Sequence, residues 1–307
     1  MEVLDLQKQK NVLIYSVVAI LAALVVCGSV WDFEIAKNVY AGQMPGENIF
    51  GIIFSFIGVI PTFVGWSFLG ASIFCLSKRQ IENPKKRRGY VVLAVLLFVL
   101  SFFYFCNTLY MSNANAFEVH FVIAYSVGIA VIYAAGYLGY KLSERSGDGE
   151  LLNKVMFLTV VSLVTLIIIS ITKEIMCRPR FRFVLAMNDT DLFRNWWQSG
   201  RSLKASIGKG VITDEFASLP SGHSAYSMFA IFLFPAFADF VSKLEKYRPL
   251  LFALGFVWWV ASAFSRMTVG AHYLSDVAIA GLVTVFAYAS VSVAYKVYSR
   301  RKGIKTI

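Results

Sequence analysis

The sequence has little charge for its length. Aspartate, glutamate, lysine and arginine make up 15% of its 307 residues, whereas hydrophobic residues make up 58%. A soluble domain of this size carries a markedly more charged surface, so the composition excludes an ordinary soluble protein. It predicts an all-α, polytopic helical membrane protein, because each crossing of a hydrocarbon core takes about 20 apolar residues in a helix.

Cysteine and histidine are also scarce, with four and three residues respectively. Three of the cysteines fall in apolar stretches and no CxxC pair occurs, which excludes a disulfide framework and a cysteine-based metal site. No internal repeat or low-complexity linker divides the chain. We expect one membrane domain, in which residues 1–80 form an accessory N-terminal hairpin and residues 81–307 form the core.

Eight stretches are long and apolar enough to be read as spans. The first lacks a small-x-small site at its end, so we expect it to be retained and not cleaved as a signal peptide. The predicted spans are 12–30, 50–76, 90–111, 117–140, 155–172, 223–241, 250–264 and 274–297.

Basic residues collect in the loops on one side of this predicted bundle. KRQIENPKKRR occupies 78–88, SKLEKYR occupies 242–248 and RRKGIK occupies 300–305, whereas the loops at 31–48 and 111–116 hold one lysine between them. Short loops rich in lysine and arginine stay cytoplasmic. With eight spans, both termini are then cytoplasmic. The net charge of +11 is read as a topology signal, and no basic patch interleaved with aromatics indicates nucleic-acid binding.

One basic segment falls on the opposite side and needs another reason. Residues 177–220 form a long extracytoplasmic segment, and a local task such as binding an anionic substrate explains its charge better than topology does. Its basic residues are Arg178, Arg180, Arg182, Arg194, Arg201, Lys204 and Lys209.

Three polar segments at the ends of predicted spans reach this same extracytoplasmic face. The fifth span ends in SITKEIMCRPRFRF, the sixth begins with PSGH at 220–223, and SRMTVGAHYLSD at 265–276 joins the seventh to the eighth. The span assignment used apolar residues only, so this convergence is an independent signal.

The histidines of these segments suggest proton transfer and nucleophilic attack. His272 and Asp276 are four residues apart, which places them on one helix face, so the carboxylate can accept the Nδ1 proton and leave Nε2 free. His223 can then protonate a leaving group. A structural pair or half of a metal site remains open for His272 and Asp276, although clustered cations disfavour a metal ion. His120 has no evident partner and is expected to pack at the interface.

The remaining polar residues suit a phosphate group. Arg180 and Arg266 can each grip two phosphate oxygens, and Lys173 adds a compact charge. Ser221 and Gly222 lie at a predicted helix N-terminus, where backbone N–H groups favour an anion. Two alternatives to phosphate binding remain open: Lys173 could extend from a helix end to the membrane interface, and Arg266 could be an interfacial anchor.

Together these motifs resemble the signature of the type-2 phosphatidic acid phosphatase superfamily. The matching residues are Lys173-x6-Arg180, Pro220-Ser221-Gly222-His223 and Ser265-Arg266-x5-His272-x3-Asp276. This superfamily includes membrane lipid phosphatases and is related to bacterial acid phosphatases and vanadium haloperoxidases. The resemblance implies a six-helix core, with the first two spans as an addition. One position departs from the pattern, because Phe181 stands where the family usually has proline.

The resemblance also implies roles and a reaction. His272 attacks phosphorus and becomes a phosphohistidine, Asp276 orients it, and His223 protonates the departing oxygen. The phosphate is held by Lys173, Arg180, Ser221, Gly222 and Arg266, with no metal or cofactor. We expect a lipid phosphatase in the cell membrane, with undecaprenyl diphosphate, phosphatidylglycerophosphate, phosphatidic acid or lipid A as substrate. A lipid phosphotransferase and a non-catalytic lipid-binding or transport protein remain alternatives, and the oligomeric state is open.

Overall fold

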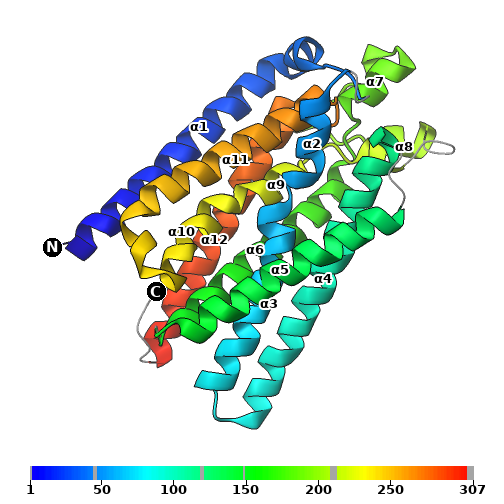
Figure 1. Cartoon of the computed structure of the whole chain (residues 1–307). Helices are drawn as coiled ribbons and strands as arrows, with labels where there is room; N and C mark the ends of the chain where they lie inside the picture. The colour runs from blue at the N-terminus through cyan, green and yellow to red at the C-terminus, as the bar shows by residue number, and fades with distance from the viewer. Residues whose placement is uncertain (1, 44–46, 118–120, 148, 208–212, 303–307) are drawn as a thin grey trace. The chain divides into compact units, whose positions relative to one another are not determined.

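A computed structural model describes residues 2–43, 47–117, 121–147, 149–207 and 213–302, and every regular element within these ranges is a helix (Figure 1). The prediction of an all-α protein is confirmed. His120 and Lys209 lie outside the described residues. The long helices are α1 (Glu2–Val39), α3 (Ile60–Gln80), α4 (Pro84–Phe117), α5 (Phe121–Arg145), α6 (Leu151–Met176), α11 (Arg248–Thr268) and α12 (Leu274–Lys302). The shorter ones are α2 (Ile49–Ile57), α7 (Phe181–Met187), η1 (Thr190–Leu192), α8 (Arg201–Ile207), η2 (Thr213–Phe216), α9 (Gly222–Met228), α10 (Ala230–Phe240) and η3 (Ser242–Tyr247).

Seven helical stretches of the described chain are long and apolar enough to cross a membrane. The protein is therefore a multi-pass membrane protein, and these stretches coincide with seven of the eight predicted spans. The remaining prediction, 223–241, falls on two helices: α9 has 7 residues and α10 has 11. Each alone is shorter than the roughly 20 residues that a span requires. The carbonyl of Phe229 accepts from the N–H groups of both Phe232 and Leu233, which tightens the backbone at the break.

The start of α4 shows how the sequence sets a helix boundary. Asn83 precedes it, and its side-chain oxygen accepts hydrogen bonds from the N–H groups of Lys85 and Lys86 at 2.9 and 3.2 Å. Pro84 occupies the first helical position, where its missing N–H costs nothing. An N-cap followed by proline is a strong helix start, and it follows directly from the Asn-Pro pair.

The chain forms two compact units, each assembled from three separate pieces. The second unit comprises Phe56–Leu163, Tyr226–Trp259 and Tyr288–Ile307. Within it α3 packs against α4 and α5 (Figure 1). Buried polar contacts tie α3 to its neighbours: the Ser67 hydroxyl donates to the Ile132 carbonyl at 2.7 Å, and the Trp66 indole donates to Ser162 at 2.9 Å.

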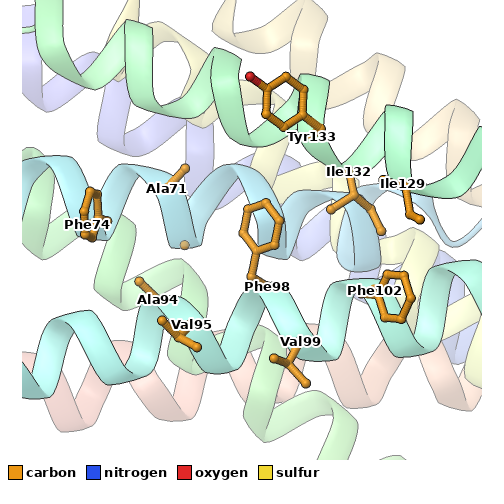
Figure 2. Close-up of a pocket in the computed structure, with 11 residues that line it drawn as sticks. Ala71, Phe74, Ala94, Val95, Phe98, Val99, Phe102, Ile129, Ile132 and Tyr133 are labelled. Carbon is orange, nitrogen blue, oxygen red and sulfur yellow. The ribbon is translucent and has the colours of Figure 1, made fainter. Parts of the chain in front are cut away.

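An apolar groove of about 630 Å³ lies among these three helices. Figure 2 shows its labelled side chains, which are hydrocarbon apart from the hydroxyl of Tyr133. Small residues such as Ala71 and Ala94 leave room in the wall, and Phe98 and Phe102 border it. Such a surface suits a membrane-embedded helix bundle, where hydrocarbon chains contact apolar side chains.

The first unit comprises Met1–Ser55, Val164–Ala225 and Val260–Ala287, and it contains all the predicted site residues. Its aromatic core joins α1 to the segments around the site. Phe33 of α1 and Tyr40, which follows α1, each make an edge contact with Phe181, at centroid distances of 5.7 Å. Phe181 also contacts Tyr273, which precedes α12, at 6.1 Å. This core fixes the helix ends that carry the polar residues.

Candidate active site

The structure brings the three polar segments together. The Ser218 carbonyl lies 2.6 Å from Nδ1 of His272, and the N–H of Ser221 donates to the Asp276 carbonyl at 3.2 Å. The N–H of Ser218 in turn donates to the carbonyl of Arg178 at 3.0 Å. Segments that are about 40 to 55 residues apart in sequence are thus joined by direct hydrogen bonds.

Each predicted residue lies at a helix end or just beyond one. Lys173 is in the last turn of α6, and Arg180 directly precedes α7. Ser221 directly precedes α9, which begins with Gly222 and His223. Arg266 is in the last turn of α11, His272 lies between α11 and α12, and Asp276 is in the first turn of α12. Gly270 makes the turn after α11 possible, because its φ of 63° suits glycine.

His272 is buried, and its ring is fixed by the backbone of another segment. Nδ1 lies 2.6 Å from the Ser218 carbonyl but 3.8 Å from the nearer carboxylate oxygen of Asp276. The expectation that Asp276 itself accepts the Nδ1 proton is therefore wrong in this geometry, because Ser218 occupies that position. A carbonyl can only accept, so the proton belongs on Nδ1 and the lone pair on Nε2.

The charge state of His272 follows from its surroundings. Burial lowers its pKa to about 3, and the positive charges of Arg180 and Lys173 act in the same direction, while Asp276 opposes them. At neutral pH the ring is therefore uncharged. A neutral imidazole with a fixed tautomer is the form that a nucleophile requires.

Asp276 is fully buried and all of its partners are donors. One oxygen accepts from the Ser218 hydroxyl at 2.6 Å and from the N–H of Tyr273 at 2.9 Å. The other accepts from the guanidinium of Arg178 at 2.6 Å. Asp276 thus holds Ser218, whose carbonyl holds His272, so the carboxylate positions the ring through one intermediate residue as well as by its charge.

The three predicted cations have different partners. Arg180 donates to the Asp214 carbonyl and to the Asp214 carboxylate, both at 2.8 Å. Burial raises the pKa of Asp214, but the neighbouring Arg180, Lys173 and Arg182 lower it below its usual value, so the carboxylate is ionised. Lys173 donates to the Ala217 carbonyl at 2.7 Å. An anion at Arg180 would therefore meet a competing carboxylate.

Two buried nitrogen atoms of the site have no hydrogen-bond partner within the described chain. They are Nε2 of His223 and Nε of Arg266. The other buried side-chain atoms without a partner in the described chain are hydroxyl oxygens. Arg266 does donate to the Ser55 hydroxyl through Nη1. Unpaired buried polar atoms cost free energy, and a bound phosphate would give both nitrogens a partner.

Sequence reasoning missed three buried residues around the site. Ser218 supplies the carbonyl for His272, and Arg178 contacts Asp276, although it had only been counted with the basic cluster. Asp32 of α1 contacts Arg178 at 2.9 Å. Asp32 fell in the predicted loop 31–48, where a carboxylate is ordinary, so no signal for it was present in the sequence; in the structure it lies on α1, which continues to Val39.

Among the described residues, no group of three or more histidines, cysteines, aspartates and glutamates has a metal-binding arrangement. The polar groups around His272 and His223 are mainly cations and hydrogen-bond donors, which are suited to an anion.

Comparison with known families decides the classification. The model of the PAP2 superfamily matches residues 154–302, which include every predicted site residue from Lys173 to Asp276. Residues 154–302 belong to the PAP2 superfamily. No match was found to any curated protein or to any solved structure. PAP2 proteins are phosphatases, so membership supports an enzyme that acts on phosphate esters.

The structure gives a reason for phenylalanine at position 181, where the family usually has proline. This residue begins α7, a position at which proline is favourable because its N–H is not needed. In this chain the N–H of Arg182, the next residue, donates to the Gly270 carbonyl at 2.9 Å, and the Phe181 ring enters the aromatic core with α1. At position 181, an aromatic ring that packs against α1 thus replaces the proline.

Proposed function

We propose that the protein is an integral membrane phosphatase that hydrolyses a lipid phosphate monoester or diphosphate through a phosphohistidine on His272. The observation that carries the proposal is the buried, neutral His272 with Nδ1 held by Ser218, together with the unpaired nitrogens of His223 and Arg266. Membership of the PAP2 superfamily supports the reaction class.

The first chemical step is an in-line displacement. Nε2 of His272 forms a bond to phosphorus as the bond to the leaving oxygen breaks, and His223 transfers a proton to that oxygen. The negative charge of a bound phosphate favours the protonated form of His223 that this step needs. Charge on the equatorial oxygens is stabilised by Lys173, Arg180 and Arg266, together with Ser221 and Gly222.

The second step hydrolyses the phosphohistidine. His223 now accepts a proton from water, whose oxygen bonds to phosphorus as the bond to Nε2 breaks. The products are inorganic phosphate and a neutral His272, and His223 is again protonated for the next cycle. Residue roles and proton balance are thus the same at the start and end of a turnover.

The location of the site supports a lipid substrate. Lys173, Arg266 and Asp276 belong to stretches that are each long and apolar enough to cross a membrane. A substrate whose tail remains in the bilayer can present its phosphate to such helix ends. Undecaprenyl diphosphate, phosphatidylglycerophosphate, phosphatidic acid and lipid A carry the required phosphate, and within this account residues 81–307 form the catalytic core.

Phosphate release from these four lipids by the purified protein in detergent tests the proposal. We expect inorganic phosphate from at least one of them, with the dephosphorylated lipid as co-product. A radiolabelled phosphate that moves to an acceptor lipid without release would show a phosphotransferase. No change in any of the lipids would support the non-catalytic alternative.

Excess EDTA should leave phosphate release unchanged. The proposed charge stabilisation comes from lysine and arginine side chains and from no metal ion. The measurement is the initial rate before and after prolonged chelation, with a divalent-ion add-back as control. A loss on chelation that one divalent ion restores would show metal-assisted hydrolysis.

We further propose that the site faces the extracytoplasmic side of the cell membrane and that both termini are cytoplasmic. The proposal rests on the basic loops at 78–88, 242–248 and 300–305, and on α9 and α10 together making one crossing. The substrate would then be met in the outer leaflet.

Single cysteines at two exposed positions test this orientation. In a background without the four native cysteines, a cysteine replacing Ser199 should react with an impermeant thiol reagent in intact cells. A cysteine replacing Asn83 should react only after the cells are permeabilised. The reverse pattern would place the site in the cytoplasm.

A further inference from the structure

The N-terminal helix α1 carries a buried carboxylate next to the site. Asp32 is 2% exposed, and its oxygens accept from the N–H of Ser275 at 2.9 Å and from the Ser275 hydroxyl. It also accepts from Nη2 of Arg178 at 2.9 Å. A buried carboxylate on an apolar helix is costly unless it is paired, so this contact network is needed to retain it.

Arg178 connects Asp32 to Asp276 and is closed off from substrate. Its side chain is 0% exposed, and while Nη2 pairs with Asp32, Nη1 donates to Asp276 at 2.6 Å. Nε donates to the Arg194 carbonyl at 2.7 Å, and the guanidinium lies 4.2 Å from the centre of the Tyr273 ring. Arg178 therefore bridges two carboxylates and does not bind phosphate.

The charges of this cluster show what Asp32 contributes. Arg178 alone would neutralise Asp276, whereas two carboxylates and one guanidinium leave one net negative charge. When Nε2 of His272 bonds to phosphorus, the ring becomes positively charged. The groups near His272 from the other segments are His223 and the cations Lys173, Arg180 and Arg266, which do not stabilise that charge.

We propose that Asp32 is a positioning residue of the active site, which balances Arg178 so that Asp276 keeps its negative charge for the imidazolium formed on His272. This inference rests on the proposed phosphohistidine reaction. It assigns α1 to the catalytic machinery, although residues 1–80 are predicted to be accessory and α1 lies outside the PAP2 match.

The packing of α1 supports a specific docking at this point. Gly28 lies one turn before Asp32, and a Cβ at Gly28 would lie 2.9 Å from both the N and the Cβ of Ser275. Only glycine permits that approach to α12. Two further hydrogen bonds fix α1 on either side of Asp32. The Trp196 indole donates to Ser29 at 2.8 Å, and the N–H of Ala41, just after α1, donates to the Thr268 carbonyl at 2.8 Å.

Charge compensation tests the inference. Asp32→Asn keeps the shape but removes the charge, so we expect kcat to fall about 10- to 100-fold while KM changes little. The double variant Asp32→Asn/Arg178→Met restores the net charge of the cluster, so it should recover much of the lost kcat. Formation of the phosphohistidine, measured by rapid quench, should slow and recover in parallel.

Ser29→Ala is the matched control, because it removes an α1 contact one turn from Asp32 and leaves the charge cluster intact; its kcat should stay close to wild type. If Asp32→Asn does not fold, the double variant still decides, since it also removes the guanidinium that lost one of its two carboxylate partners, and it should retain kcat within about tenfold of wild type.

Three results would overturn the inference. They are an unchanged kcat in Asp32→Asn, a double variant slower than the single one, and a folded double variant that is inactive. Each requires an active wild-type protein, so each leaves the proposed function standing. A wild-type protein that releases no phosphate removes the proposed function and the role of Asp32 together.

Discussion

Replacing His272 with alanine should reduce phosphate release to less than about 1% of the wild-type rate, since removing a covalent nucleophile costs several orders of magnitude. The imidazole is buried and accepts no proton in the resting state, so its Nε2 lone pair is the proposed phosphoryl acceptor. The measurement is the initial rate of phosphate release by purified protein with the best lipid of the panel.

The variant must be shown to be folded and inserted, because His272 packs in the core of the first unit. Size-exclusion profile and thermal unfolding in detergent provide this check. The matched control is His120→Ala, which removes the one histidine for which the sequence predicts no catalytic role. A folded His272→Ala protein with substantial residual turnover would exclude His272 as the nucleophile.

Replacing His223 with alanine should slow turnover by about 10²- to 10⁴-fold, the usual contribution of a general acid and base. Its Nε2 is buried and has no partner within the described chain, which leaves it available to substrate. Both proposed steps use this nitrogen, first to protonate the leaving oxygen and then to activate water. Steady-state phosphate release from lipid substrates measures the loss.

An aryl phosphate separates the two roles of His223. Its leaving group needs little protonation, so the variant should still release a burst of phenol and then stall as the phosphohistidine accumulates. Wild-type protein should show no such stall. A variant that turns over lipid and aryl substrates at the wild-type rate would contradict the assignment of His223.

The fold class could be predicted because it depends on local sequence, and local motifs also led to the proposed site residues. A span needs a run of about 20 apolar residues, which is visible in the sequence itself. His272 and Asp276 are four residues apart on the chain, so they lie close together, although His272 precedes α12 and the expected placement on one helix face is not observed. The break at Phe229 was missed because residues 228–238 are apolar throughout and contain only Pro235 as a helix breaker.

The hydrogen-bond and ion-pair partners of the site residues could not be predicted from the sequence, because they depend on tertiary contacts. The Nδ1 partner of His272 is the backbone carbonyl of Ser218, and a backbone acceptor has no residue signature. Asp32 reaches Arg178 across 146 positions of the chain. The charge balance at Asp276 became visible only when α1 was placed against α12.

The most direct test of the account is to locate the phosphorylated residue. Wild-type protein and His223→Ala would be mixed with an aryl phosphate carrying a radiolabelled phosphate, quenched within milliseconds in alkali, and digested for peptide mapping. We expect label on the peptide that contains His272, more of it in His223→Ala, and none in His272→Ala. Label on another residue, or release of phosphate by the wild type without any labelled histidine, would contradict it.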